Sequence, residues 1–171
     1  MKKELSPVGA VALGVGAGVI GTGFMTAWQE TVAKLKRSMT PKHMSDNGDD
    51  PWAKAPAPAQ IGRLLVRTVL KSDVPPERIP LFTNAVHWAF GTLMGGAYGL
   101  LERKVDGKTK LGGPLFGLGV WAQSYATLVP LGLYKPPWKY PAKSIAKDVS
   151  YHLVYGTGTA AGYGLLRRLS R

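Results

Sequence analysis

The chain of 171 residues contains no cysteine, and this absence excludes disulfide bonds, thiolate metal sites and cysteine nucleophiles. Acidic residues are also scarce, because 10 Asp and Glu stand against 22 Lys and Arg and leave a formal net charge of +12. The basic residues flank apolar segments, and no nucleic-acid-recognition motif accompanies them. We therefore expect no nucleic-acid partner, and we expect the positive charge to attract anionic lipid headgroups.

Charge of either sign is absent from four long stretches between residue 7 and residue 166. A helix needs roughly 20 residues to cross a bilayer core, and three of the stretches exceed that length while the last is slightly shorter. The 22 glycines gather in these stretches, where close helix packing in lipid tolerates them. The sequence predicts an all-α integral membrane bundle of four transmembrane helices, with a soluble helical domain as the alternative. The predicted transmembrane helices span about residues 7–29, 80–101, 111–134 and 146–166.

The first stretch begins as a secretory signal peptide does, with Lys2 and Lys3 ahead of an apolar run. The run is longer than a typical signal-peptide core, and no clear A-x-A-like cleavage site precedes Trp28. We expect the segment to be retained as a membrane helix that continues past Trp28 toward Lys34.

The segment between the first two predicted spans, residues 38–79, divides into two parts. Asp, Gly and Pro residues between 46 and 58 favour an irregular, solvated loop. In residues 60–71 apolar side chains gather near one helical face and basic side chains lie away from it, which predicts a short amphipathic helix. We expect this helix to lie in the membrane interface, although a helix packed on a soluble partner has the same pattern. Its apolar side chains are Ile61, Leu64, Leu65 and Val69, and its basic side chains are Arg63, Arg67 and Lys71.

An internal repeat relates the second and fourth predicted spans. Residues 87–101 align without a gap to residues 152–166, and a fainter echo relates residues 13–16 to residues 116–119. The pattern predicts a duplicated two-helix hairpin, with the two copies related as parallel repeats about an axis along the membrane normal. The identical pairs are His87/His152, Gly91/Gly156, Thr92/Thr157, Tyr98/Tyr163, Gly99/Gly164, Leu100/Leu165 and Leu101/Leu166.

Small residues recur every fourth position in three of the spans, which places each row on one helical face. This spacing predicts close helix crossings, with a glycine-lined pore or an oligomer contact as alternatives. The rows are Ala10, Gly14 and Gly18; Gly91, Gly95 and Gly99; and Gly156, Ala160 and Gly164.

Residues 21–27, residues 87–102, and residues 130–137 followed by His152 carry small-residue motifs. These motifs resemble the YagU-like family of bacterial inner-membrane proteins. The resemblance implies a small multipass protein of the bacterial inner membrane, in a family without a settled biochemical activity, so no catalytic residues are carried over. The acidic, proline-containing segment at residues 46–58 departs from that pattern. Basic residues near the predicted hairpin loop and the C-terminal tail favour a cytoplasmic location for both termini.

His87 and His152 are the strongest candidates for chemistry, because they occupy matched positions near the starts of two predicted spans. A pair of imidazoles there could relay protons or handle a solute, whereas the plainer interpretation is one interhelical hydrogen bond for each. Ligation of haem or metal has weak support, since no further ligands accompany the pair. Asp148 lies one turn before His152 and could orient it, or could simply be an acidic residue near a helix start.

Two uncharged polar residues complete the candidate site. Asn84 precedes His87 by about one turn and is expected to bond to its own helix start. Gln123 lies in the middle of the third predicted span, where an unpaired amide in lipid is costly, and we expect it to join helices more readily than to contact a substrate.

No nucleotide-binding loop, nucleophile-and-base arrangement or calcium-loop spacing is present in the sequence. We expect no enzyme activity, no cofactor and no metal site. The hypothesis is a small inner-membrane bundle that acts through a protein partner, as an accessory or scaffold subunit, or through self-association. The alternative is a channel or transporter for protons or a small solute, lined by His87, His152, Asp148 and Gln123.

Overall fold

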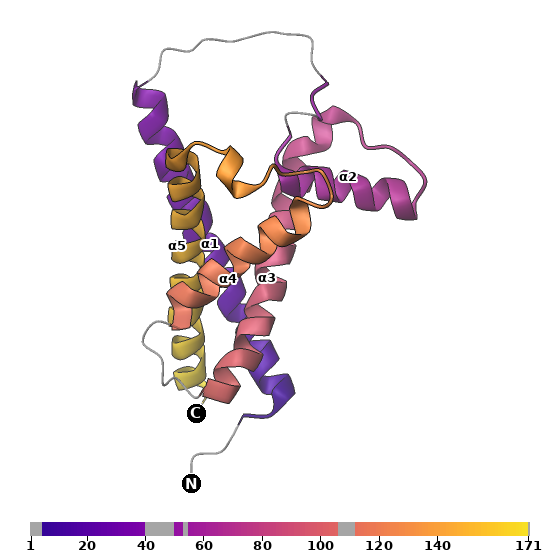
Figure 1. Ribbon diagram of the computed structural model, residues 1–171. Coiled ribbons are helices and arrows are strands. Elements are labelled where there is room, and N and C mark those ends of the chain that lie inside the picture. The colour runs from indigo at the N-terminus through magenta and orange to yellow at the C-terminus, as the bar shows by residue number, and fades with distance from the viewer. Residues whose placement is uncertain (1–4, 40–49, 53–54, 106–111, 171) are drawn as a thin grey trace.

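The computed structural model describes residues 5–39, 50–52, 55–105 and 112–170, and over these residues the chain is all-α, as predicted. The basic loop after residue 105 and most of the loop at residues 40–54 lie outside the described residues. Figure 1 shows α1, α3 and α5 as long helices, with α4 crossing them and α2 projecting sideways. The helices are α1 (Pro7–Met39), α2 (Ala57–Val69), α3 (Ile79–Val105), α4 (Gly112–Leu128) and α5 (Ala142–Leu169), with short 3-10 turns at η1 (Pro76–Arg78) and η2 (Pro137–Lys139).

Helix α1 packs against both α3 and α5. Gly14 faces Gly95 and Gly99 of α3, and Gly18 faces Gly91. The partner residue number falls as the α1 number rises, so α3 runs antiparallel to α1. On its other side α1 runs antiparallel to α5, because Ile20 meets Gly162 and Phe24 meets Gly158. The two outer helices α3 and α5 therefore run parallel to each other.

Glycine at these crossings is required by the closeness of the backbones. A Cβ at Gly95 would overlap the carbonyl oxygen of Gly14, and a Cβ at Gly99 would overlap that of Ala10. The α4–α5 crossing is equally tight, because a Cβ at Gly117 would overlap the carbonyl oxygen of His152. A Cβ placed at Gly113 would lie 2.8 Å from the Cβ of Ala160. On α1, a Cβ at Gly21 would lie 2.7 Å from the carbonyl oxygen of Tyr155 on α5. The pairs α1–α3, α4–α5 and α1–α5 thus approach to backbone contact through small residues.

Gly164 differs from the other residues of the predicted rows. Among the described residues nothing lies within 4 Å of a Cβ placed there, whereas Gly156 meets the backbone of Gly113 and Gly117. The reason is the position of α4, which begins at Gly112 beside Ala160 and so does not extend along α5 as far as Gly164.

The predicted third span also ends early. Helix α4 stops at Leu128 instead of Tyr134, because Pro130 has no backbone N–H to continue the helix. The chain turns there, with Gly132 at a φ of 71°. The backbone N–H groups of Leu133 and Tyr134 both donate to the carbonyl oxygen of Leu128, at 3.0 and 3.2 Å. These bonds satisfy the carbonyl that the interrupted helix leaves open.

Within the described residues one helix is long and apolar enough by composition to cross a membrane: Pro7–Leu35, with a mean hydropathy of 1.8 over its most apolar window. A signal sequence or the core helix of a soluble protein has the same length and composition. Helix α4 has 17 residues and is shorter than a typical span.

The bundle interior contains few large aliphatic side chains. Its largest fully buried side chains are Thr22 and Thr159, whereas leucines such as Leu93, 66% exposed, lie on the surface. Four tyrosines, Tyr98, Tyr125, Tyr155 and Tyr163, are buried among the described residues, and the ring of Tyr98 packs edge-on against Tyr163 at 5.8 Å between centroids.

Helix α2 belongs to a second, small core. Trp52 is 4% exposed, packs with Ala59 and Val74, and donates from Nε1 to the carbonyl oxygen of Val74 at 3.1 Å. Arg63 lies 4.7 Å over the Trp52 ring and forms a two-bond ion pair with Asp73, at 2.7 and 2.8 Å. These contacts fold the segment after α2 back along the helix.

Candidate functional site

The polar cluster between α4 and α5 centres on Asp148. Its Oδ2 accepts hydrogen bonds from Trp121 Nε1 at 3.0 Å and from the Tyr125 hydroxyl at 3.2 Å. Trp121 and Tyr125 are one helical turn apart on α4, so both reach the same carboxylate. Because a partly buried carboxylate is costly without donors, these two bonds explain how Asp148 is accommodated between the helices.

Asp148 also fixes His152, which follows it by one turn of α5. His152 Nδ1 lies 2.9 Å from the backbone carbonyl oxygen of Asp148 and 3.7 Å from Oδ1 of its carboxylate. A carbonyl oxygen only accepts, so Nδ1 carries the proton in this contact and Nε2 is the nitrogen with the lone pair in a neutral ring. The hydrogen bond to the backbone carbonyl orients the imidazole, as a carbonyl or carboxylate partner of Nδ1 does in many histidine sites.

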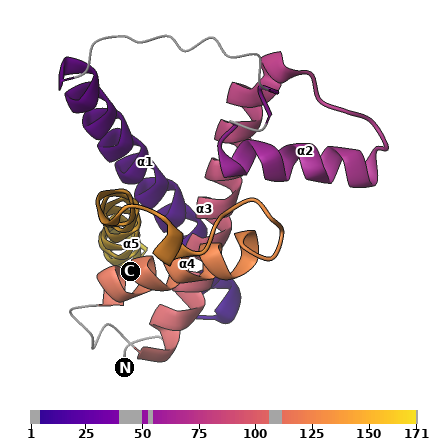
Figure 2. The same ribbon diagram turned by 45° about the horizontal axis from the view of Figure 1, so that its top comes forward.

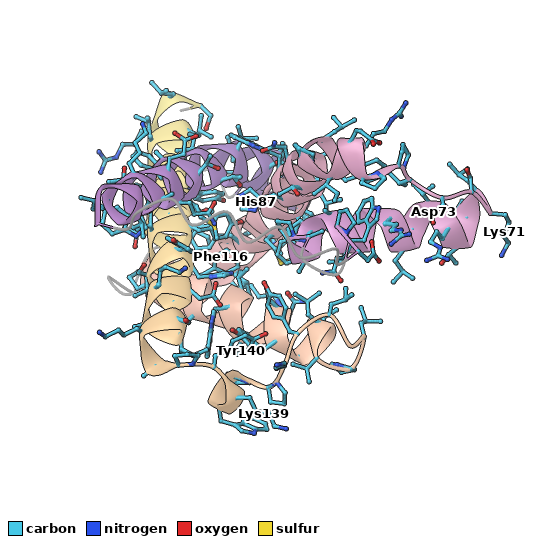
Figure 3. The ribbon with its side chains drawn as sticks, turned by 90° about the horizontal axis from the view of Figure 1, so that it is seen from above. Lys71, Asp73, His87, Phe116, Lys139 and Tyr140 are labelled. Atoms are coloured by element: carbon cyan, nitrogen blue, oxygen red, sulfur yellow. The ribbon has the colours of Figure 1, made fainter. Side chains whose placement is uncertain are left out.

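His87 comes from α3 and lies inside the bundle near α1 (Figure 3). Its Nε2 is buried and has no hydrogen-bond partner among the described residues, and the same holds for Thr26 Oγ1 on α1. His87 and His152 each lie about one helical turn before Gly91 and Tyr155, which a hydrogen bond joins at 2.7 Å, so the two histidines lie at a similar depth in α3 and α5. Among the described residues no direct hydrogen bond joins the two imidazoles.

A second interhelical contact joins α3 to α5 beside the histidines. The Tyr155 hydroxyl donates to the carbonyl oxygen of Gly91 at 2.7 Å. Thr22 and Thr159, both fully buried, donate to carbonyl oxygens of their own helices, Gly18 at 2.8 Å and Tyr155 at 2.8 Å. These three hydroxyls are thus satisfied, whereas His87 Nε2 and Thr26 Oγ1 are buried without a partner among the described residues.

Asn84 and Gln123 lie apart from the histidine pair. Asn84 donates to the carbonyl oxygen of Pro80 at 2.9 Å, within its own helix. Gln123 donates from Nε2 to Thr127 Oγ1 at 2.9 Å, also within its own helix, and its side chain is exposed. Gln123 therefore does not join two helices of this chain. Its α4 face is turned away from α5, because Gly117 occupies the close crossing.

Instead, Gln123 lines an apolar groove of about 440 Å³ between α3 and α4. Apolar side chains form most of its wall, and Gln123 and Glu102 are its polar groups. The Tyr98 hydroxyl donates to Glu102 at 3.1 Å along this wall. The lining residues are Met94, Tyr98, Leu101, Glu102, Gly112, Leu115, Phe116, Gly119, Val120 and Gln123.

The two sides of the bundle differ in how closely their helices pack. Where α1 packs closely on α5, a Cβ at Gly158 would touch Phe24 at 3.0 Å and one at Gly162 would touch Ile20 at 3.0 Å. Helix α4 stays farther from α3 than α1 does from α5, and the space between α3 and α4 remains open.

A second cavity of about 360 Å³ lies beside Phe24 and the outer face of α5. Neither this cavity nor the α3–α4 groove is lined by His87 or His152. Among the described residues, no three His, Asp or Glu side chains are grouped closely enough to hold a metal ion.

Two parts of this site were not identified from the sequence. The donors to Asp148, Trp121 and Tyr125, belong to another helix, and only their one-turn spacing on α4 could have indicated a shared partner. The groove is lined by residues of α3 and α4, and no signal in the sequence indicated that these two helices would remain apart.

Comparisons with protein-family models, with curated proteins and with solved structures found no match for this chain. The resemblance to the YagU-like family stays a prediction from the motifs quoted above.

Proposed function

We propose that the chain is a small integral membrane protein in which α1, α3, α4 and α5 form a four-helix transmembrane bundle, and that it acts as an accessory or scaffold subunit by binding a membrane helix of a partner protein. The observation that carries the membrane assignment is the distribution of side-chain size. Glycines, alanines, threonines and tyrosines make up most of the buried residues of the bundle, while most of its large aliphatic residues lie outside. Soluble proteins bury their large aliphatic residues, whereas membrane helices pack through small residues and turn the large ones to lipid.

The ends of the bundle support the same placement. Trp138, in the aromatic turn after α4, is 79% exposed and is flanked by Lys135 and Lys139. Arg103 and Arg168 lie in the last turns of α3 and α5, at the other end of these helices from Trp138. Aromatic and basic residues at helix ends are typical of the headgroup region. The 17 residues of α4 extend about 26 Å, and a short span of this kind is accommodated by local thinning or by flanking apolar residues.

The proposed hairpin repeat has its best support in α3 and α5. One matched pair of these helices meets, since Tyr98 packs on Tyr163, and the matched histidines lie at a similar depth. The first helices of the hairpins are less alike. Gly14 meets Gly95 and Gly99, whereas Gly117, its counterpart in the fainter echo, meets His152. That contact is about two helical turns away from the one that strict repetition requires.

The α3–α4 groove is the proposed binding site for the partner helix. Gly112 and Gly119 in its wall permit close approach of another backbone. The carbonyl oxygen of the Gln123 side chain forms no hydrogen bond with a described residue, although the amide nitrogen binds Thr127. In lipid an unpaired amide oxygen is unfavourable, so the groove suits a helix that brings a donor better than an acyl chain.

Cross-linking from single cysteines tests this proposal, because the natural chain has none. Leu115→Cys places a thiol in the groove, and Leu165→Cys, at a similarly exposed position on α5, is the matched control. With a short photo-cross-linker on the thiol in native membranes, we expect one discrete adduct with another protein for Leu115→Cys and none for Leu165→Cys. An adduct of twice the chain mass would contradict the accessory role and establish self-association. Equal or absent adducts at both positions would remove the groove from the account.

The second candidate, a proton or small-solute path, has one specific observation in its favour. His87 Nε2 is buried and has no hydrogen-bond partner in the part of the chain that the structure describes, an arrangement that a helix-packing role alone does not require. Proton flux into liposomes containing the purified chain tests it. A path predicts flux that is lost in both His87→Ala and His152→Ala, and the scaffold role predicts no flux above that of empty liposomes.

A further inference from the structure

We propose that the outer face of α2 binds the surface of an anionic lipid membrane, with Leu64, Leu65 and Val69 inserted at the headgroup boundary and with Arg67 and Lys71 against lipid phosphates. This inference rests on the membrane placement proposed above. It assigns a specific lipid-binding surface to a segment outside the bundle.

The first observation is that α2 packs on α3 with a face other than its most apolar one. Ala59, Gly62 and Val66, spaced by three and four residues, form the packed face. A Cβ at Gly62 would overlap the ring of Phe82 on α3. Small residues therefore make the contact with α3, as they do in the bundle.

The larger apolar residues of α2 remain unpartnered. Leu64, Leu65 and Val69 are 44%, 56% and 71% exposed. At about 100° per residue, Ile61, Leu64 and Leu65 form one arc on the side of the helix away from Ala59 and Val66. Val69 continues this arc at the edge next to Gly62 and is exposed there at the end of the helix. A contiguous apolar face of this kind on a surface helix marks an interaction site.

Basic side chains follow the apolar face along one edge. Arg63 and Arg67 are four residues apart on α2, so they share a stripe on the helix, and Lys71 follows just beyond the helix end. Arg63 is occupied by Asp73 and by the Trp52 ring. Arg67 and Lys71 are exposed at the end of the stripe. Basic residues beside a bilayer surface are each attracted to anionic headgroups by about 1 kcal/mol, which corresponds to roughly fivefold in affinity.

The placement of α2 favours lipid over a soluble protein as the occupant. Figure 1 and Figure 2, which differ by a turn about the horizontal axis, both show α2 running across the direction of α3 and away from the bundle. Its contact with α3 is at Phe82, in the first turn of that helix. A helix that crosses a transmembrane helix near its end lies along the membrane plane, where its apolar face meets the acyl-chain boundary.

The tip of α2 carries a further unusual feature. Lys71 has a φ of 51°, in the left-handed region that favours glycine. The turn it makes lets Asp73 reach back to Arg63. Helix α2, Trp52 and the segment that folds back along the helix form what we call the α2 arm, and Figure 3 shows Lys71 and Asp73 at its free end. Lys71 therefore lies at the part of the arm that is farthest from the bundle.

The test uses the full-length chain in lipid nanodiscs, with an environment-sensitive dye on one introduced cysteine. Leu65→Cys reports on the proposed face, Glu77→Cys in the exposed η1 turn is the water-facing control, and Leu93→Cys reports on the bundle. With brominated lipids, we expect quenching of the dye at positions 65 and 93 and none at position 77.

The charge contribution is tested in the same system. In the Leu65→Cys background, Arg67→Gln with Lys71→Gln should lower the lipid-docked fraction several-fold in discs containing phosphatidylglycerol, and should change it little in neutral discs. Lys143→Gln with Arg168→Gln removes the same charge from exposed positions elsewhere and should leave docking unchanged.

The outcomes separate this inference from the proposed function. Quenching at 93 without quenching at 65 would overturn the lipid-binding role of α2 and leave the membrane bundle intact. A dye at 65 that is shielded from water but not quenched by brominated lipid would assign the face to a protein instead. Absence of quenching at both positions would overturn the membrane placement itself.

Discussion

The bundle and the α2 arm bury different kinds of side chain within one chain. In the arm, Trp52 is enclosed, its indole N–H is bonded and an ion pair covers it, as in a small soluble domain. In the bundle, helices touch through Gly14, Gly95 and Gly117, and the large aliphatic residues lie outside. The hydrophobic effect therefore stabilises the small core of the arm, which water surrounds. Close packing of one helix backbone on another stabilises the bundle, which we propose to lie in lipid.

The largest effect is expected in the arm. Trp52→Ala should destabilise the arm by about 3–5 kcal/mol, because it removes the centre of the small core together with its hydrogen bond. Trp138→Ala, at an exposed position, is the control. Hydrogen exchange should show faster exchange of the α2 amides in Trp52→Ala with unchanged exchange in α1 and α5. Faster exchange throughout the chain would contradict the separation of the two regions.

A single methyl group in the bundle should have the next largest effect. Gly95→Ala forces its Cβ into Gly14 and Gly18, so we expect a loss of about 1–3 kcal/mol in the free energy of unfolding in detergent. Gly164→Ala is the matched control, because no described atom lies within 4 Å of its added Cβ. Its effect should stay within about 0.5 kcal/mol. Similar losses for both variants, measured by thermal unfolding, would show that the crossing is looser than described.

The interhelical hydrogen bond from Tyr155 should contribute less. Tyr155→Phe keeps the ring and removes the donor to the Gly91 carbonyl, so we expect a loss of about 0.5–1.5 kcal/mol. Tyr151→Phe, on the same helix and less buried, is the control. Unfolding in detergent measures both, and a neutral Tyr155→Phe would mean that this contact does not hold α3 to α5.

The smallest effect concerns pH and is confined to the arm. The hydrogen bonds from Arg63 and from the Val74 N–H hold the pKa of Asp73 well below its usual range. A lowered pKa in the folded state contributes stability above the unfolded pKa of about 4, and that contribution is lost as pH falls below it. Protection of the α2 amides from hydrogen exchange should therefore weaken in acid. In Asp73→Asn this protection should be weaker already at neutral pH and should no longer change between neutral and acidic pH. An unchanged pH profile in Asp73→Asn would assign the dependence to another group.

The sequence predicted the helix positions better than the helix contacts. Apolar periodicity located an amphipathic helix at residues 60–71, and α2 spans Ala57–Val69. Periodicity identifies an apolar face but does not say whether the chain covers it, and the face that packs is the one with Gly62. The early end of α4 was readable from Pro130, but absence of charge continued to residue 134 and misplaced the boundary.

The candidate site was less accessible to sequence reasoning. Asp148 and His152 are neighbours on one helix, so their spacing alone places them together. Trp121 and Tyr125 reach Asp148 from α4, and such a contact depends on how two helices cross. Gln123 was expected between helices because of its depth, whereas its rotation about the α4 axis turns it to the groove.

Labelling of Leu93→Cys with a membrane-impermeant maleimide tests the membrane placement most directly. The side chain at this position is 66% exposed, so only lipid would keep the reagent away. In intact membranes the proposed placement predicts no labelling of Leu93→Cys from either side. Lys139→Cys and Arg168→Cys, at opposite ends of the bundle, are the controls, and each should label readily from one side of the membrane. Rapid labelling of Leu93→Cys without detergent would place this helix face in water and contradict the account.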